Sequence, residues 1–333
     1  MKILVTGGGG FLGGAIVKML KERGDDVVSF SRGKYNHSAA MGVEQKQGGL
    51  ADADAVLRAA EGCDLVFHVA AKAGIWGPYE EYHDANVKGT QNVLDACRKH
   101  GIQKLVYTSS PSVVFNGTDM EGVDESVPLA SEFVTHYPKT KAEAERLVMA
   151  ANSDSLATTA LRPHLIWGPG DNHLVPRILE KGAKGQLRRI GRRNCKVDSV
   201  YIDNAADAHV LAGDVLKPGS ANAGKAYFIS NGEPIPVWDL VDGILAAGGQ
   251  GPVTRVVPTW FAYGAGALLE AIYSVCGIKS EPRMTRFVAK ELSSAHWFDI
   301  SAAERDFGYR PKVSNDEGLA KLKAALDAQK NPV

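Results

Sequence analysis

Short apolar runs alternate with amphipathic stretches along the first half of the chain. Runs at residues 2–6, 27–31, 64–69, 104–108 and 158–161 predict strands, and the run at 64–69 is apolar on both faces, as in a buried parallel strand. The stretches between them, at residues 53–60, 86–99 and 137–151, carry apolar positions at helical spacing. Because strands that alternate with helices pair in parallel through right-handed crossovers, the pattern predicts an α/β fold with a doubly wound parallel sheet.

The pattern changes after Gly168-Pro169-Gly170, where segments become shorter and loops longer. We therefore expect a nucleotide-binding domain over residues 1–168 and a smaller C-terminal substrate-binding lobe over residues 169–333. The two are expected to be partly interleaved, because a short later run at 226–229 can return to the main sheet or extend it. The tail, at residues 315–328, has the spacing of an amphipathic helix.

The charge balance and the cysteine positions argue against several classes of function. Among 333 residues, Lys and Arg number 38 and Asp and Glu number 38, so no overall charge favours a nucleic acid or an anionic membrane. The four cysteines lie far apart and form no Cys-x-x-Cys pair, and no His, Asp and Glu spacing is typical of a metal site. We expect no metal, no nucleic-acid partner, no transmembrane segment and a cytoplasmic protein with reduced thiols.

Three glycines follow the first apolar run at a spacing of three: Gly7, Gly10 and Gly13. A strand, a glycine turn and a helix form the opening unit of a Rossmann-type dinucleotide-binding sheet. Gly7 would permit a tight turn, Gly10 the close approach of a pyrophosphate, and Gly13 the packing of helix on strand. A glycine-rich turn that binds nothing is the alternative.

A second motif carries chemistry. Tyr137 and Lys141 are four residues apart, so a helix over 137–151 places both on one face. A free tyrosine titrates near pH 10, and a neighbouring ammonium favours its phenolate. Residues 108–110, Thr-Ser-Ser, end the preceding strand at the edge of the sheet where ligands bind. An ordinary pair of surface residues is the competing interpretation.

These motifs together resemble the extended short-chain dehydrogenase/reductase family. The matching pieces occur in order: Thr6–Gly13, His68-Val69-Ala70-Ala71, Asn86–Thr90, Thr108-Ser109-Ser110, Tyr137-x-x-x-Lys141, Leu161-Arg162-Pro163 and Gly168-Pro169-Gly170. Residues 112–115, 162–164 and 197–205 are similar to the 3β-hydroxysteroid dehydrogenase branch. Residues 70–77, 166–173 and 226–234 look like bacterial reductases of 2-alkyl-3-oxoalkanoates from long-chain olefin biosynthesis.

The resemblance implies a role for individual residues. Tyr137 would donate a proton to the substrate carbonyl, Lys141 would hold the nicotinamide ribose and lower the pKa of Tyr137, and Ser110 would hydrogen-bond the substrate oxygen. Ser109 and Ser112 are close enough to compete for that last role. Asn86 would support the site from the neighbouring helix, or be a satisfied buried amide. The implied cofactor-binding residues are Gly7, Gly10, Phe11, Leu12, Gly13, Arg32, Leu50, Ala70, Ala71, Lys72, Tyr137, Lys141 and Pro163.

The end of the second strand bears on the cofactor. It reads Ser31-Arg32-Gly33-Lys34, with no acid to bind a ribose 2′-hydroxyl, and Arg32 can pair with a 2′-phosphate. This favours NADPH over NADH, with NADH as the weaker alternative. The family often has an aspartate for the adenine where Gly48-Gly49 precede Leu50, and Asp52 is the available substitute.

The implied reaction is reduction of the 3-oxo group of a hydrophobic 2-alkyl-3-oxoalkanoate to the 2-alkyl-3-hydroxyalkanoate. Pro111-Ser112 stand where sugar-nucleotide dehydratases of this family carry Asp-Glu. A 3β-hydroxysteroid or sterol dehydrogenase is the enzymatic alternative, and an NADP-binding sensor or scaffold without turnover is the alternative of another class. The resemblance also implies a homodimer formed through residues 86–99 and 137–151, and olefin-pathway enzymes as partners.

Substrate residues are the least constrained part of the sequence. Trp76, Ser112, Trp167 and His173 are the candidates for a pocket, together with an apolar stretch at residues 257–277 that predicts a substrate-covering helix. Glu270 interrupts that stretch, which disfavours a membrane span, and a peripheral lipid contact is the reserve hypothesis. The basic run at 184–193 is a solvated loop or an attractor for a substrate carboxylate.

Overall fold

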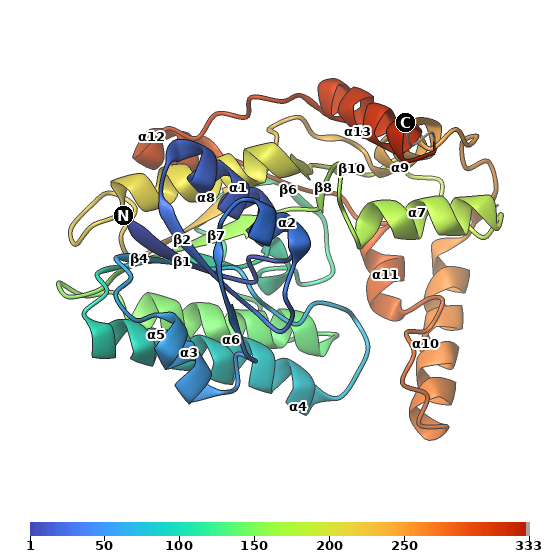
Figure 1. Ribbon diagram of the computed structural model, residues 1–333. Helices are drawn as coiled ribbons and strands as arrows, with labels where there is room; N and C mark the ends of the chain where they lie inside the picture. The colour runs from blue at the N-terminus through green and yellow to red at the C-terminus, as the bar shows by residue number, and fades with distance from the viewer. Residues whose placement is uncertain (331–333) are drawn as a thin grey trace.

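A seven-stranded parallel sheet forms the centre of the molecule (Figure 1). The structure is a computed structural model that describes residues 1–330. The strands lie in the order β12-β7-β5-β4-β1-β2-β3. Their bounds are β1 (Lys2–Thr6), β2 (Asp26–Ser31), β3 (Glu44–Gln47), β4 (Leu65–His68), β5 (Lys104–Thr108), β7 (Ala157–Pro163) and β12 (Lys225–Ile229). The predicted doubly wound parallel sheet is confirmed, and its topological switch point lies between β1 and β4.

The strand register brings the candidate residues to one edge. Thr6, the last residue of β1, lies opposite Phe30 of β2 on one side and His68 of β4 on the other. His68 in turn lies opposite Tyr107 of β5. Because all these strands are parallel, their carboxyl ends and the loops that follow them meet along a single edge, where ligands of such sheets bind.

Helices cover both faces of the sheet (Figure 1). One face carries α1 (Phe11–Arg23), α8 (Ile202–Val215) and α12 (Ser301–Phe307), and the other carries α3 (Ala53–Ala59), α5 (Gly89–His100) and α6 (His136–Ala150). Three short helices, α2 (Asn36–Ala40), α4 (Tyr79–Tyr82) and the 3₁₀ turn η2 (Pro111–Val113), lie in the loops between strands. Each face buries an apolar core that includes alternate residues of the same strands, such as Ile3 on one side and Leu4 on the other.

The chain after residue 168 is interleaved with the sheet. It supplies α8, which packs against α1, and β12, which extends the sheet by pairing with β7. The remaining strands form a four-stranded sheet and two small pairs: β13 (Ile235–Pro236), β10 (Lys196–Val197), β15 (His296–Phe298) and β6 (Met120–Val123); β11 (Val200–Tyr201) with β8 (Ile166–Trp167); and β14 (Val256–Val257) with β9 (Arg189–Ile190).

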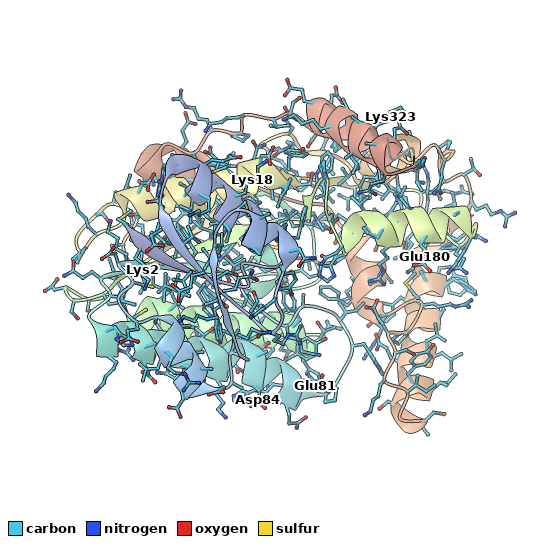
Figure 2. The ribbon with its side chains drawn as sticks, viewed as in Figure 1. Lys2, Lys18, Glu81, Asp84, Glu180 and Lys323 are labelled. Carbon is cyan, nitrogen blue, oxygen red and sulfur yellow. The ribbon has the colours of Figure 1, made fainter. Side chains whose placement is uncertain are left out.

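The helices of the C-terminal part are α7 (Leu174–Ala183), α9 (Val237–Ala247), α10 (Thr259–Val275), α11 (Arg286–Glu291) and α13 (Asn315–Lys330). Charged side chains occupy the outward faces of α1, α7 and α13, as Lys18, Glu180 and Lys323 show (Figure 2). The predicted helix in the 257–277 stretch is α10, which stands out from the body of the molecule (Figure 1). No helix within residues 1–330 is both long enough and apolar enough to cross a bilayer.

Candidate active site at the carboxyl edge of the sheet

The turn between β1 and α1 requires glycine at two positions. Gly7 has φ of +73°, and a Cβ built on it would lie 3.0 Å from the Cα of Ala70. A Cβ on Gly13 would overlap the carbonyl oxygen of Gly7, so α1 could not approach the strand this closely with any other residue. Gly10 donates a 2.8 Å hydrogen bond from its backbone N–H to that same oxygen and begins the helix.

The first turn of α1, which begins at Phe11 and Leu12, fits a phosphate. Gly10 provides no side-chain cap, and the turn contains no acidic residue. The backbone N–H groups therefore face outward at the positive end of the helix dipole, without a competing carboxylate. This is the geometry that a dinucleotide pyrophosphate needs.

The end of β2 adds a hydroxyl and a cation to the turn. Ser31 accepts a 3.2 Å hydrogen bond from the backbone N–H of Gly9, so its side chain lies against the glycines. Arg32 is exposed and forms no hydrogen bond or ion pair with the residues that the structure describes. The ring of Tyr35 covers Gly9, where any Cβ would collide with it. The roles of Ser31 and Tyr35 were not predicted from the sequence, because they depend on how the β2–α2 loop folds back.

A buried hydroxyl and imidazole shape the loop after β4. The Thr6 hydroxyl accepts 3.1 Å hydrogen bonds from the backbone N–H groups of both Val69 and Ala70, and it contacts His68 Nδ1 at 2.8 Å. The other ring nitrogen of His68 contacts Thr90 Oγ1 at 3.0 Å. Burial lowers the pKa of His68 to about 3, so the ring is neutral. This network holds the turn that carries Ala70 and Ala71 beside Gly7.

Asn86 connects that loop to the helix of the Tyr-Lys motif. Its side-chain oxygen accepts a 2.7 Å hydrogen bond from the backbone N–H of Lys72, and its amide donates to the Lys72 carbonyl at 3.1 Å and to Thr140 Oγ1 at 3.0 Å. Asn86 is therefore a satisfied buried amide that also positions the site. The predicted helix over 86–99 begins as a π-helix, η1 (His83–Lys88), and continues as α5. Such π turns occur often at functional sites.

Leu50 lies where the loop after β3 meets α5. Its carbonyl accepts a 2.8 Å hydrogen bond from Asn92, and its side chain packs so closely on Gly89 that a Cβ there would collide. Asp52 accepts the backbone N–H of Ala55 at 3.0 Å and thereby caps α3. The Asp52 carboxylate is thus used to cap the helix, and the structure does not assign it to binding an adenine.

Tyr137 and Lys141 lie on the same face of α6 and reach the end of β5. Burial raises the pKa of Tyr137 above its usual value, while a contact from the Ser110 hydroxyl opposes this rise. Lys141 is 2% exposed, donates a 2.5 Å hydrogen bond to the Thr108 carbonyl, and lies 4.1 Å above the ring of Tyr107. Burial lowers the pKa of the Lys141 ammonium to about 7, against the opposing charge of Glu145.

The three candidate serines have different partners. Ser109 is buried and donates a 2.5 Å hydrogen bond to Glu145 Oε2. Ser110 is half-buried and contacts both the Tyr137 phenol and Ser112 Oγ, the latter at 2.9 Å. Ser112 also donates its backbone N–H to Ser110 Oγ at 3.2 Å. Of the three serines, Ser110 is therefore the one whose side chain acts on the pKa of Tyr137, and Ser112 is hydrogen-bonded to Ser110.

A buried ion pair lies next to the Tyr-Lys motif on α6. Glu145, one turn after Lys141, accepts hydrogen bonds from Arg162 Nε at 3.1 Å and Nη2 at 2.6 Å. Both side chains are almost fully buried. Separating the pair would leave an uncompensated buried charge, which is strongly unfavourable. Because Glu145 is on α6 and Arg162 is on β7, the pair holds the helix against the strand just before Pro163, where the strand ends.

The four candidate substrate residues are not gathered in one place. Trp76 donates a 3.0 Å hydrogen bond from its indole N–H to the Ile278 carbonyl, and its ring packs edge-on against Tyr273 of α10. Trp167 is 0% exposed and donates to Ser199 Oγ at 2.9 Å, so it is a core residue with no surface for a substrate. His173 is exposed at the start of α7. Of the four, Ser112 alone hydrogen-bonds one of the candidate site residues, Ser110.

Most cations of the basic run at 184–193 bind the protein itself. Arg189 donates to Asp242 at 2.6 Å, Arg193 pairs with Asp119 and Glu121, and Lys184 pairs with Glu180. Arg188 donates to backbone carbonyls of its own loop. Among residues 1–330, no three His, Cys, Asp or Glu side chains gather so as to hold a metal ion.

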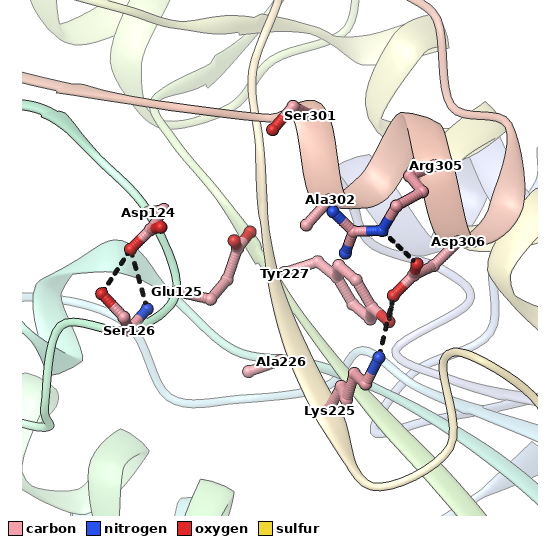
Figure 3. Close-up of a pocket in the computed structure, with 10 residues that line it drawn as sticks. All are labelled: Asp124, Glu125, Ser126, Lys225, Ala226, Tyr227, Ser301, Ala302, Arg305 and Asp306. Atoms are coloured by element: carbon pink, nitrogen blue, oxygen red, sulfur yellow. Dashed lines mark hydrogen bonds and ion pairs between the residues drawn. The ribbon is translucent and has the colours of Figure 1, made fainter.

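A hollow of 410 Å³ lies elsewhere, beside the edge strand β12 (Figure 3). Its polar groups are paired with one another, because Asp306 accepts from Lys225, Tyr227 and Arg305. Glu125 accepts the backbone N–H of Phe228 at 2.8 Å and so covers the free edge of the sheet. These contacts explain the hollow as edge protection, apart from the site at the carboxyl ends of β4 and β5.

Comparison with known proteins agrees with this geometry. Residues 4–256 match the model of the 3-beta hydroxysteroid dehydrogenase/isomerase family. The chain belongs to that family. Its members are dehydrogenases and reductases, and the chain is an NAD(P)-dependent oxidoreductase of the short-chain dehydrogenase/reductase type.

Two relatives align over nearly the whole chain. A 2-alkyl-3-oxoalkanoate reductase from Stenotrophomonas maltophilia is 54% identical over 98% of this chain and 100% of its own length. A 2-alkyl-3-oxoalkanoate reductase from Shewanella oneidensis is 51% identical over 97% of this chain and 85% of its own length. The crystal structure of gox2253 superposes with a TM-score of 0.78 and 27% identity, covering 99% of this chain and 98% of that one. The predicted branch of the family is confirmed.

Proposed function

We propose that this chain is an NADPH-dependent reductase that converts the 3-oxo group of a 2-alkyl-3-oxoalkanoate to the 3-hydroxyl. The placement of the Tyr137–Lys141 pair carries the proposal, because both residues lie on α6 and Lys141 is hydrogen-bonded at 2.5 Å to the Thr108 carbonyl at the end of β5. Ser110 follows that strand end and its side chain lowers the pKa of Tyr137, so a carbonyl oxygen could accept from both hydroxyl groups. The high identity to two proteins named 2-alkyl-3-oxoalkanoate reductase supports the substrate class.

The phenol is suited to donate a proton. Because burial raises the pKa of Tyr137, the side chain stays protonated at neutral pH in the free chain. Tyr137 would give its proton to the carbonyl oxygen while Ser110 held that oxygen by a hydrogen bond; the hydride is the chemistry that a nicotinamide would supply when bound. Oxidation of an alcohol would instead use the phenolate as base, so the protonated phenol of the free chain is the form that reduction requires.

Lys141 lies one helical turn after Tyr137 on α6. Its ammonium is oriented by the 2.5 Å hydrogen bond to the Thr108 carbonyl, and the nearby carboxylate of Glu145 favours the charged form. A pKa of about 7 lets it carry a proton at neutral pH or release one. We infer that Lys141 binds the nicotinamide ribose and favours the phenolate that remains after proton transfer.

The cofactor preference follows from the end of β2. The residues beside the glycine turn are a hydroxyl, Ser31, and an unpaired guanidinium, Arg32, within the described part of the chain. A 2′-phosphate would accept hydrogen bonds from both the Ser31 hydroxyl and the Arg32 guanidinium. A 2′-hydroxyl would find no carboxylate there to accept its hydrogen bond. This combination favours NADPH over NADH.

An NADPH-consumption assay tests the proposal. The purified chain is given a 2-alkyl-3-oxo acid or a 3-oxosteroid, each with NADPH and with NADH. We expect turnover with the acid and NADPH, and loss of turnover in Tyr137→Phe. Faster steroid turnover with NAD(H) would identify a 3β-hydroxysteroid dehydrogenase. Unchanged turnover in Tyr137→Phe would overturn the catalytic assignment, and binding of NADPH without any turnover would favour a sensor.

We further propose a homodimer and a place in olefin biosynthesis. The helices α5 and α6 lie side by side on the face of the sheet away from α1 and α8 (Figure 1). Pairing of these helices across a two-fold axis would leave the catalytic edge open. Sedimentation velocity at micromolar concentration tests the dimer, and a monomer would contradict it. A test for co-purification with the other enzymes of the pathway would examine the partner proposal.

A further inference from the structure

The helix α10 exposes an apolar stripe along its outward face. Trp260 is 75% exposed, Leu268 63% and Val275 88%, and Phe261 and Ile272 are also exposed. These five residues are here called the α10 stripe. The adjacent pair Trp260 and Phe261 is followed at seven to eight, four and three residues by the other members, so all five lie on one side of the helix. Gly264 and Ala271 fill the positions between them, so this side of the helix carries no charge at all.

The single charge of α10 faces the protein instead. Glu270 accepts hydrogen bonds from Arg286 of α11 through its backbone N–H at 2.7 Å and its Nε at 2.6 Å. Gly266 lies so close to the backbone of Thr285 that a Cβ would collide. The single charge of α10 is therefore neutralised by the protein. Small residues such as Ala262 and Gly266 are buried, whereas the large apolar side chains of the stripe are exposed, unlike in an ordinary surface helix.

Unpaired cations lie at both ends of the stripe. Arg255 precedes the helix, and Arg192 is placed beside its start because Gly191 donates its backbone N–H to the Val257 carbonyl. Lys279 and Arg283 follow its end. All four are exposed, and none forms an ion pair within residues 1–330. The nearby acids are neutralised, since Glu281 pairs with Arg177 and Asp242 with Arg189.

We propose that the α10 stripe binds an anionic lipid surface, with the stripe in the acyl region and the four cations at the headgroups. Exposed apolar patches of this kind mark interaction sites, and aromatic residues with flanking cations suit the boundary between headgroups and acyl chains. A second copy of this chain fits less well, because a two-fold axis through the stripe would bring Arg192 and Arg255 against Lys279 and Arg283 or against themselves.

Vesicle binding tests this without cofactor or substrate, and so independently of the proposed function. The chain is sedimented with vesicles of equal parts phosphatidylglycerol and phosphatidylcholine, or of phosphatidylcholine alone. Cys276 supplies a second readout, because it is exposed at the end of α10 while the other three cysteines are buried, and a polarity-sensitive dye can be attached there. We expect binding to the anionic vesicles and a blue shift of the dye.

Two variants separate the apolar and the charged contributions. Leu268→Glu with Ile272→Glu should weaken vesicle binding about tenfold or more, because it places charge in the acyl region. Arg255→Gln with Lys279→Gln should weaken it about fivefold per cation, as should added salt. Val215→Glu is the matched control, since Val215 is 40% exposed at the end of α8, and it should bind like the parent.

Three results would overturn the proposal. The first is a parent chain that stays in the supernatant with anionic vesicles at low salt, which would leave the stripe to a partner protein. The second is a double Glu variant that binds as well as the parent while its circular dichroism is unchanged. The third is a lipid-free dimer that the double Glu variant dissociates, which would assign the stripe to a second copy.

Discussion

The Ser109 hydroxyl donates a 2.5 Å hydrogen bond to the buried carboxylate of Glu145. The same carboxylate holds Arg162, so Ser109 belongs to a structural network. The next residue, Ser110, faces the Tyr137 phenol. Two adjacent serines at the strand end thus have different partners: Ser109 binds the ion pair that holds α6, and Ser110 influences the phenol of Tyr137.

This difference predicts opposite effects of two alanine substitutions. Ser109→Ala should lower the free energy of unfolding by about 1–3 kcal/mol, because it removes a buried hydrogen bond to a charged group, and should leave kcat nearly unchanged. Ser110→Ala should lower kcat about 10- to 100-fold with little effect on stability. Urea unfolding and steady-state kinetics measure both. The reverse pattern would transfer the catalytic role to Ser109.

Tyr137 should remain a phenol well above neutral pH. Burial is the largest influence on its pKa and raises it, so the free chain favours the protonated form. The ultraviolet difference spectrum between the parent and Tyr137→Phe should show no phenolate signal up to about pH 9 and should gain it only above the usual tyrosine pKa of about 10. A phenolate signal near pH 7 would argue against Tyr137 as the proton donor of the free enzyme.

Arg32 should determine the choice between NADPH and NADH. Arg32→Ala should raise the KM for NADPH about 10- to 100-fold, because a charge-assisted contact to the 2′-phosphate is worth about 1.5–3 kcal/mol, and should leave the KM for NADH unchanged. Arg58→Ala removes another exposed guanidinium, from the end of α3, and serves as the control. Equal changes for both cofactors in Arg32→Ala would remove the specificity role.

The parts of the fold that the sequence predicted are those that depend on local pattern. The apolar run at residues 104–108 is β5, because a strand buried on both faces needs uninterrupted apolar side chains. Gly7 and Gly13 stand where the turn excludes a Cβ, and that requirement is visible in the spacing alone. The pair Tyr137 and Lys141 is brought to one face by helical periodicity.

The rest depends on contacts between distant segments. The partner of Ser109 is Glu145, which lies 36 residues away, so spacing could not distinguish Ser109 from Ser110. Trp167 is aromatic and near the site in sequence, yet it donates to Ser199 inside the core. The exposure of α10 was hidden for the same reason: an apolar stretch predicts burial, and the inward position of Glu270 depends on Arg286.

The buried ammonium of Lys141 should lower the free energy of unfolding, so that replacing Lys141 should raise it. The folded-state pKa of about 7 lies below the ordinary value of 10.5, so burial penalises the charged form. The penalty is fully present below about pH 7 and declines as the pH rises toward 10.5, where the unfolded chain also loses its proton. Lys141→Met removes the charge but also the hydrogen bond to the Thr108 carbonyl. The net gain in unfolding free energy at pH 7 should be about 1–3 kcal/mol, with catalysis lost.

Urea unfolding of the parent and Lys141→Met at several pH values measures this gain, which should shrink steadily between pH 7 and 10. Lys139→Met is the matched control, because Lys139 is exposed on the same helix and should show no such pH dependence. A Lys141→Met variant that is less stable than the parent by a constant amount at every pH would mean that the ammonium is solvated. In that case the pKa of Lys141 would not be lowered by burial, and the role inferred for Lys141 could not rest on a near-neutral pKa.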